Sequence, residues 1–359
     1  MVGLSFRIAV VKGLRKKKKM KRSNVKRNRR ILSKPDSKPV AVDLPELPLG
    51  YVDKDGHGDY ALLSTFPRNL KAKVFELDEY VTIPGMGGCL VNVLEGLMCC
   101  RIGRSVRICN LTTKQHVELP VVVSNILGDN SNMWNHFGYD PIQEEYKVIS
   151  LIWEMAQERV VRSEYHVLVL GPGASWRRIT QSVPPHCPCS QGVSIDRCLY
   201  YGAWTGENTF VVVCFNMSSE KFNLIKLPLH AAGTNLMNYR GKLAVFDYSP
   251  NLASDQRLDM WVLEDDSQWS NKKTFALPIS NIDVIIPGEL SVQGTSREGT
   301  VRVFSKTGYS SLHALCDLYT GKKREWVALP KLRERLPFET DSLHTTYWDD
   351  FGSIMYLET

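Results

Sequence analysis

The segment Val211–Pro228, VVVCFNMSSEKFNLIKLP, contains two apolar runs that flank a short turn and ends in Leu-Pro. Runs rich in β-branched and aromatic residues on both sides of a polar turn predict an antiparallel hairpin. Further segments repeat this order of strand, turn and strand, in most cases with the closing Leu-Pro. They begin at Val106 (VRICNLTTKQHVELP), Tyr165 (YHVLVLGPGASWRRI), Leu258 (LDMWVLEDDSQWSNKKTFALP) and Leu312 (LHALCDLYTGKKREWVALP).

The spacing of these repeats predicts the architecture. They recur roughly every 45 to 60 residues, close to the 40 to 50 residues of a propeller blade. The segments between them also have the pattern of strands or hairpins, so each unit supplies about four strands. Blades in a ring bury their faces and protect their edges. We therefore predict an all-β fold, an irregular β-propeller of about five or six blades, with a β-sandwich as the alternative.

The two ends of the chain are expected to meet. The C-terminal stretch TTYWDDFGSIMYLET, residues 345–359, has the pattern of a strand, and so does AKVFELDEYVTI, residues 72–83. Pairing between them would close the ring. This gives three parts: a disordered basic tail over 1–40, a linker over 41–70, and the propeller domain over 71–359.

The positive charge is concentrated at the N-terminus. Net charge is +7, but Met1–Lys38 holds fifteen of the 45 basic residues and one of the 38 acidic ones, so the remainder is mildly acidic. Two basic clusters fit the acidic grooves of nuclear import receptors, which predicts a nuclear protein, with the cytoplasm as the alternative. A solvated tail and an organellar transit peptide are the other interpretations. The cluster residues are Lys16, Lys17, Lys18, Lys19, Lys21, Arg22, Lys26, Arg27, Arg29 and Arg30.

Composition excludes several classes of protein. With 43% hydrophobic and 23% charged residues, the chain can bury a core. No apolar run reaches the roughly 18 residues of a membrane helix, so no membrane partner is expected. The nine cysteines are odd in number and several lie in strand-like runs, which favours reduced, mostly buried thiols. The acidic body argues against nucleic acid as a partner, except for weak contact through the basic tail.

Motifs that could carry chemistry fail at specific positions, so we expect no cofactor and no enzyme. The stretch from Asp53 resembles a calcium loop, but its twelfth position is Ser64 instead of a bidentate glutamate. GMGG and GPG lack the residues that phosphate loops require. A conceivable zinc set has one C-x-C pair and no second paired half, a spacing that disfavours zinc. Its members would be His186, Cys187, Cys189 and Cys198.

Several of these segments together resemble the associated β-propeller domain of plant F-box proteins. They include GYDPIQEEYKVISL, HVLVLGPGASWRRI, FNMSSEKFNLIKLP, YRGKLAVF, MWVLED and YWDDFGSIMYLE, in this order. The resemblance covers roughly Leu94 to Glu358. It implies a substrate receptor of a cullin-type ubiquitin ligase, in which an F-box binds a Skp-type adaptor and the propeller binds an unknown target protein.

The same segments predict architectural roles. We expect Asp140-Pro141 to form a turn, with Gly138 relieving backbone strain. Trp176, Trp261 and Trp269 are expected to be large apolar wedges within or between blades.

The F-box itself departs from the family pattern. VDLPELPLG, residues 42–50, matches only the first few residues of an F-box, and no amphipathic helices follow it. The linker over 41–70 could therefore hold a remnant of an F-box. The sequence thus resembles a family member whose F-box is truncated or absent, so adaptor and cullin are expected as partners only if that function is retained. MKRSNVKRNRR from Met20 resembles a usual start, so either Met1 or Met20 fits as the first residue.

The function predicted is a non-enzymatic protein-interaction module that resembles the recognition domain of an SCF-type ligase. The alternative is a nucleic-acid-associated protein tethered by its basic arm, whose binding would fall steeply with salt. A third hypothesis, a propeller that binds a small molecule or carbohydrate, requires a polar central funnel.

Overall fold

The structure, a computed structural model, describes residues 88–94, 96–110, 115–126, 132–206, 209–228, 235–249, 252–264 and 268–277, a few single positions, and the strands outside these ranges. This part of the chain is nearly all strand. The helix α1 (Leu252–Asp255) has four residues. No helix among the described residues is long and apolar enough to cross a membrane.

Four-stranded antiparallel meanders repeat along the chain. The first is β5 (Cys89–Leu94), β6 (Leu97–Ile102), β7 (Ser105–Asn110) and β8 (His116–Glu118). The second is β9 (Met133–Asp140), β10 (Glu145–Ala156), β11 (Arg159–Val169) and β12 (Arg177–Arg178). The third is β14 (Val193–Ile195), β15 (Cys198–Gly206), β16 (Thr209–Asn216) and β17 (Lys221–Lys226), with β13 (Cys187–Pro188) beside β15. The next is β18 (Asn235–Tyr239), β19 (Lys242–Tyr248), β20 (Arg257–Val262) and β21 (Lys273–Ala276). Then follow β22 (Leu290–Gly294), β23 (Thr300–Thr307), β24 (Ser310–Asp317) and β25 (Val327–Ala328).

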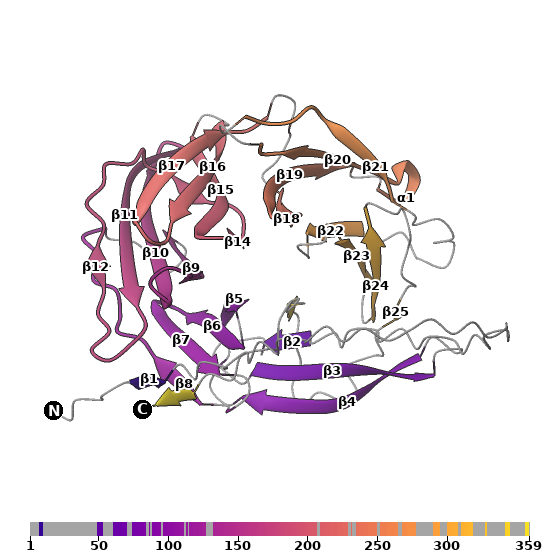
Figure 1. Ribbon diagram of the computed structural model, residues 1–359, viewed down its shortest axis with the longest axis horizontal. Coiled ribbons are helices and arrows are strands. Elements are labelled where there is room, and N and C mark those ends of the chain that lie inside the picture. Colours follow the sequence, from indigo (N-terminus) through magenta and orange to yellow (C-terminus); the bar gives the residue numbers. More distant parts are fainter. Residues whose placement is uncertain are drawn as a thin grey trace, which may run out of the picture.

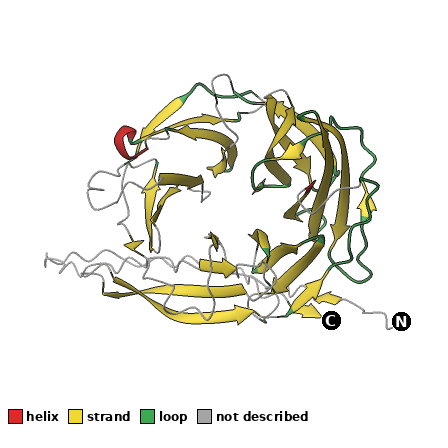
Figure 2. Ribbon diagram, turned by 180° about the vertical axis from the view of Figure 1, so that it is seen from behind, coloured by secondary structure: helices red, strands yellow, loops and turns green. Residues whose placement is uncertain are grey.

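The repeated sequence segments form the last two strands of these meanders. The pairs β7–β8, β11–β12, β16–β17, β20–β21 and β24–β25 are all antiparallel, as the sequence predicted. Figures 1 and 2 show the meanders arranged in sequence order around a ring. The prediction of an all-β, propeller-like fold is therefore confirmed, whereas the number of blades stays a prediction.

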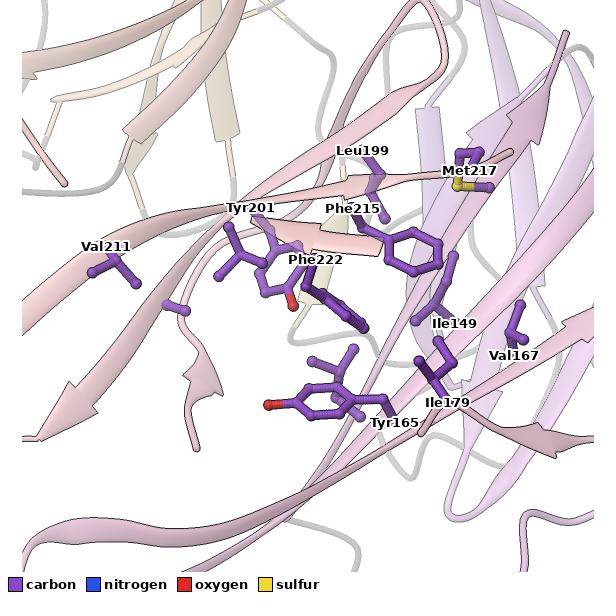
Figure 3. Packing of buried hydrophobic residues seen from close by; sticks show 13 residues of the cluster. Ile149, Tyr165, Val167, Ile179, Leu199, Tyr201, Val211, Phe215, Met217 and Phe222 are labelled. Atoms are coloured by element: carbon purple, nitrogen blue, oxygen red, sulfur yellow. The ribbon is translucent and has the colours of Figure 1, made fainter. Parts of the chain in front are cut away.

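Apolar clusters fill the spaces between successive meanders. One lies between the second and third, where Ile149 and Tyr165 face Tyr201 and Phe215 (Figure 3). Another joins β6 and β7 to β9, β10 and β11, and a third joins β18, β19 and β20 to β22 and β23. Each blade thus uses its neighbour to cover an apolar face, which is the reason that a ring forms.

This arrangement explains why inner strands read as continuous apolar runs. In β16, Val211 and Val213 pack toward the second meander, whereas Val212 packs toward the fourth. In β19, Ala244 and Val245 likewise belong to different clusters. Since both faces of each strand are buried, alternation between polar and apolar residues is lost.

The ends of the chain pair differently from the prediction. The C-terminal strand β27 (Tyr356–Glu358) pairs with β1 (Arg7–Ala9), not with β4 (Val74–Ile83). Residues 72–83 cannot receive it, because β3 (Tyr60–Asn69) occupies one edge of β4 and β25 meets the other.

The predicted linker also contributes to a sheet. β2 (Leu49–Val52) lies between β3 and β26 (Ser342–His344). These strands belong to an eight-stranded sheet that also contains β4 and β22 to β25. Part of the segment predicted as a linker with an F-box remnant therefore forms strands. The two basic clusters, and most of the stretch that resembles a calcium loop, lie outside the described residues.

The structure tests the predictions for Asp140 and Gly138. The turn at Asp140 is confirmed, because its carboxylate accepts hydrogen bonds from the N–H groups of Ile142 and Gln143 at 2.9 and 3.3 Å. Gly138 does not relieve backbone strain, because its φ is not positive. A Cβ there would lie 2.8 Å from Cε of Met217, the flexible end of a side chain that would have to shift.

Candidate protein-interaction surface

A short segment that we call the strap, Leu119–Ile126, connects the first blade to the second. It follows β8 and lies outside any strand or helix. Val122 is buried, whereas Val121 and Val123 are 54% and 86% exposed. The two exposed valines on either side of a buried one make this segment a candidate contact surface.

Trp176 fastens one end of the strap. The Nε1–H group of Trp176, from the second blade, donates a hydrogen bond to the carbonyl of Pro120. Trp269 makes the same type of bond to the carbonyl of Lys226 at 2.7 Å, near the Leu-Pro that ends the third blade's hairpin. These two tryptophans lie between blades, as the sequence predicted, and each also binds the preceding blade by a hydrogen bond. Trp261 is buried in β20.

Glu164 fastens the other end of the strap. Its carboxylate is 1% exposed and accepts hydrogen bonds from Ser124 Oγ at 2.8 Å and from the N–H of Asn125 at 3.2 Å. Arg162 and Arg178 form ion pairs with it at 2.8 and 3.4 Å. Burial alone would raise the pKa of Glu164, but the hydrogen bonds and the arginines together lower it. The carboxylate is therefore ionised and holds the strap.

A groove of about 400 Å³ lies between the strap and the second blade. Its walls combine apolar side chains with Glu164, Arg178 and His166. Burial lowers the pKa of His166, although the Glu164 carboxylate opposes this, so the imidazole is neutral. The residues that line it are Pro120, Val121, Val123, Asn125, Glu164, His166, Trp176 and Arg178.

A row of buried polar side chains reaches the groove from the centre of the blade. Ser150 lies opposite Asn135 on β9 and opposite His166 on β11. Within the described part of the chain, both amide atoms of Asn135, the hydroxyl of Ser150 and Nδ1 of His166 have no hydrogen-bond partner. Buried polar atoms are normally satisfied, so this row marks a polar interior in the second blade behind the groove.

Lys147 forms a second polar cluster, on the interface between the second and third blades. Its side chain is 2% exposed, and Nζ donates to the carbonyl of Met217 at 2.7 Å and to Glu220 at 3.1 Å. Nζ also lies 3.6 Å from the Asp140 carboxylate. All of these partners are internal, so this cluster joins blades and does not offer a site.

The four residues of the conceivable zinc set do not converge. His186 is buried, and its two ring nitrogens contact the hydroxyls of Tyr165 and Tyr201 at 3.0 and 2.8 Å. Cys198 shares a hydrogen bond with Cys214, which lowers the pKa of the Cys198 thiol to about 6. Among the described residues, no group of three or more His, Cys, Asp and Glu side chains could hold a metal ion. The eight described cysteines are free.

Sequence reasoning did not find the groove. Its residues come from 120–125, 164–166 and 176–178, and only the fold brings these segments together. A signal was nevertheless present: after Leu119-Pro120 the chain continues with Val121, Val122 and Val123, where a turn between blades would normally be polar.

The ring of four-stranded antiparallel meanders defines the class of this protein as an all-β, propeller-like fold. Residues 57–327 match the family described as the F-box associated beta propeller domain. The match covers more than half of the chain, so this protein belongs to the F-box associated β-propeller family.

Two relatives in Arabidopsis thaliana, both named after an F-box, share this region. At3g52320 is 44% identical over 297 residues, which cover 79% of this chain and 74% of the relative. At5g62660 is 37% identical over 248 residues, which cover 67% of this chain and 65% of the relative. The chain therefore spans about two thirds to three quarters of these relatives.

Among solved structures, TolB from Acinetobacter baumannii is similar with a TM-score of 0.44 and 7% identity, over 80% of this chain and 64% of TolB. A likeness at this level carries no argument about this protein.

Proposed function

We propose that this chain is the target-recognition part of an SCF-type, cullin-RING ubiquitin ligase and that it acts as a non-enzymatic protein-interaction module. The observation that carries the proposal is the family match over residues 57–327, together with the relatives that are named after an F-box. In this proposal the propeller binds the target protein, and an F-box connects it to a Skp-type adaptor and a cullin.

Buried titratable side chains in the second and third blades are bound to internal partners, which supports a binding role without catalysis. Lys147 is bound to internal carboxylates and a carbonyl, and His186 is held between two tyrosine hydroxyls. Burial raises the pKa of Tyr165 to about 12, so this hydroxyl stays protonated near neutral pH. These side chains hold blades together, as expected of a scaffold whose exposed segments carry the function.

The proposal is tested by affinity purification of the tagged full chain from plant cells, scored for Skp-type adaptor and cullin. The matched variants are Leu44→Ala with Leu47→Ala, in the stretch that resembles an F-box, and Ile142→Asp, an exposed side chain in a turn of the propeller. We expect the adaptor with the unaltered chain and with Ile142→Asp, and its loss with the double alanine variant.

The contrary result is a folded chain that brings down target proteins but no adaptor or cullin. The protein would then be an interaction module without a ligase. Circular dichroism of each purified variant, dominated by strand signal, separates loss of binding from loss of fold.

We further propose that the two basic clusters, at 16–22 and 26–30, carry the protein into the nucleus. Clusters of this kind are bound by the acidic grooves of import receptors. A nuclear receptor of this type would act on nuclear target proteins.

A further inference from the structure

We propose that the strap docks an extended segment of the target protein by strand addition, and that this segment carries an acidic side chain beside Arg178. The proposal rests on the proposed function, since it names the surface by which that target would be held. It follows from four properties of the strap and its groove.

The first property is the backbone of Val121, Val122 and Val123, in the middle of the strap. None of the N–H and C=O groups of Val121, Val122 and Val123 is hydrogen-bonded to another described residue. An exposed segment with unpaired backbone groups is a template for another extended chain, because only a peptide supplies alternating donors and acceptors at the matching spacing.

The second property is the side-chain pattern. Val122 is 3% exposed and anchors the strap to an apolar cluster with Ile126, Met133 and Ile152. Its neighbours Val121 and Val123 point their apolar surface outward and line the groove. An added chain would cover these two valines with alternate side chains of its own, which gives specificity beyond the backbone.

The third property is charge. Arg162 and Arg178, with 45% and 51% exposed side chains, share the single buried carboxylate of Glu164. His166 is neutral, so one positive charge remains beside the groove. Charge complementarity therefore selects an acidic residue in the docked segment.

The fourth property is rigidity. Trp176 holds the strap at Pro120, and Glu164 holds it at Ser124 and Asn125. The backbone between these fixed points is already ordered before a partner arrives. Binding then loses less conformational entropy than binding to a free loop would.

The experiment selects peptides on the purified full chain from a displayed library of random dodecapeptides. We expect enriched sequences to alternate apolar residues and to contain Asp or Glu. Selected peptides, made synthetically with a fluorophore, should bind Val123→Asp and Arg178→Gln at least tenfold more weakly than the unaltered chain. Ile142→Asp, which also changes an exposed apolar residue, should bind them normally.

Backbone pairing is tested separately. N-methylation of alternate residues removes backbone donors and leaves the side chains unchanged. We expect methylation on one alternate set to abolish binding and methylation on the other set to have little effect. Equal binding of both methylated forms would overturn strand addition.

Other results would also overturn the proposal. These are failure to enrich peptides, enrichment without an acidic residue, and normal binding to Val123→Asp. A monomer–dimer equilibrium in sedimentation that Val123→Asp abolishes would show that the occupant is a second copy of this chain. The peptide experiment does not contain the adaptor, so the two proposals can fail separately. Loss of peptide docking with adaptor binding retained would overturn the docking proposal alone. Peptide docking without adaptor binding would refute the ligase role alone.

Discussion

Ser124 in the strap donates a hydrogen bond of 2.8 Å to the buried carboxylate of Glu164, forty residues further along the chain. This bond joins the connection between two blades to the third strand of the second blade. It places exposed valines beside a charged groove, and it makes the groove sensitive to the charge of a single carboxylate.

Glu164→Gln should weaken the second blade. The amide cannot neutralise Arg162 and Arg178, and it accepts weaker hydrogen bonds from Ser124 and Asn125. We expect a loss of about 1–3 kcal/mol in the free energy of unfolding. Urea denaturation measures this loss. Glu118→Gln is the control, because Glu118 is 50% exposed and its ion pair with Arg107 should contribute at most about 1 kcal/mol.

His136 should make the protein sensitive to mild acid. Burial, with the nearby His186 adding to the effect, lowers the pKa of His136 from 6.5 to about 3. The unfolded chain therefore binds a proton below pH 6.5 that the folded chain does not bind, so stability falls as the pH decreases. One such group contributes a slope of about 1.4 kcal/mol per pH unit.

The variant His136→Phe tests this effect. Nε2 of His136 has no partner among the described residues, so the substitution leaves the ring stacked on Tyr201 without losing a hydrogen bond of that nitrogen. Between pH 6.5 and 4.5 the variant should lose stability less steeply than the unaltered chain, by about one proton's slope. Identical slopes in urea titrations across this range would show that His136 does not titrate as stated.

Lys147→Ala should be among the most destabilising substitutions in the second blade. It removes a buried cation and leaves the Asp140 and Glu220 carboxylates without it. We expect a loss of about 3–5 kcal/mol, the range for breaking a buried ion pair. Lys242→Ala is the control: Lys242 and Glu264 are both 43% exposed, and solvent screens such surface pairs so that they contribute little to stability. Equal losses for the two variants would contradict the structural role of Lys147.

Trp269→Phe should separate two contributions of Trp269 to stability, its hydrogen bond to the preceding blade and its apolar contact. Phenylalanine keeps an aromatic ring but loses the donor to the Lys226 carbonyl, 2.7 Å away. We expect the free energy of unfolding to fall by about 0.5–1.5 kcal/mol, while the slope of this free energy against urea concentration stays unchanged. A change in that dependence would indicate a loosened blade interface instead of a lost hydrogen bond.

Nuclear entry should depend on both basic clusters. A fluorescent fusion of the full chain is expected in the nucleus, and alanine substitution of Lys16 to Lys19 with Lys21 and Arg22, or of Lys26, Arg27, Arg29 and Arg30, should shift it to the cytoplasm. Substitution of the exposed Lys242 and Lys272, which lie on the propeller, is the control. Unchanged nuclear signal with both clusters replaced would reject the proposal.

Much of the fold was predictable because its information is local. Val211–Pro228 specifies a hairpin through β-branched runs and a short turn, and repetition of such hairpins at regular intervals implies blades. The tryptophans between blades could also be anticipated, since large aromatic residues in hairpins need an apolar neighbour. The pairing of the two chain ends could not be predicted, because the choice of partner for Tyr356–Glu358 depends on which strand edges are already occupied.

By itself, the sequence determined the strands, their hairpins and their repetition, since each follows from the order of apolar and turn residues over a few positions. Only the tertiary structure decided where the proposed binding groove lies. The strap, Glu164 and Arg178 lie up to 58 residues apart in the chain, between positions 120 and 178, and they form one groove because apolar packing sets two blades side by side. Binding surfaces depend on such long-range packing, for which a single sequence holds no periodic signal.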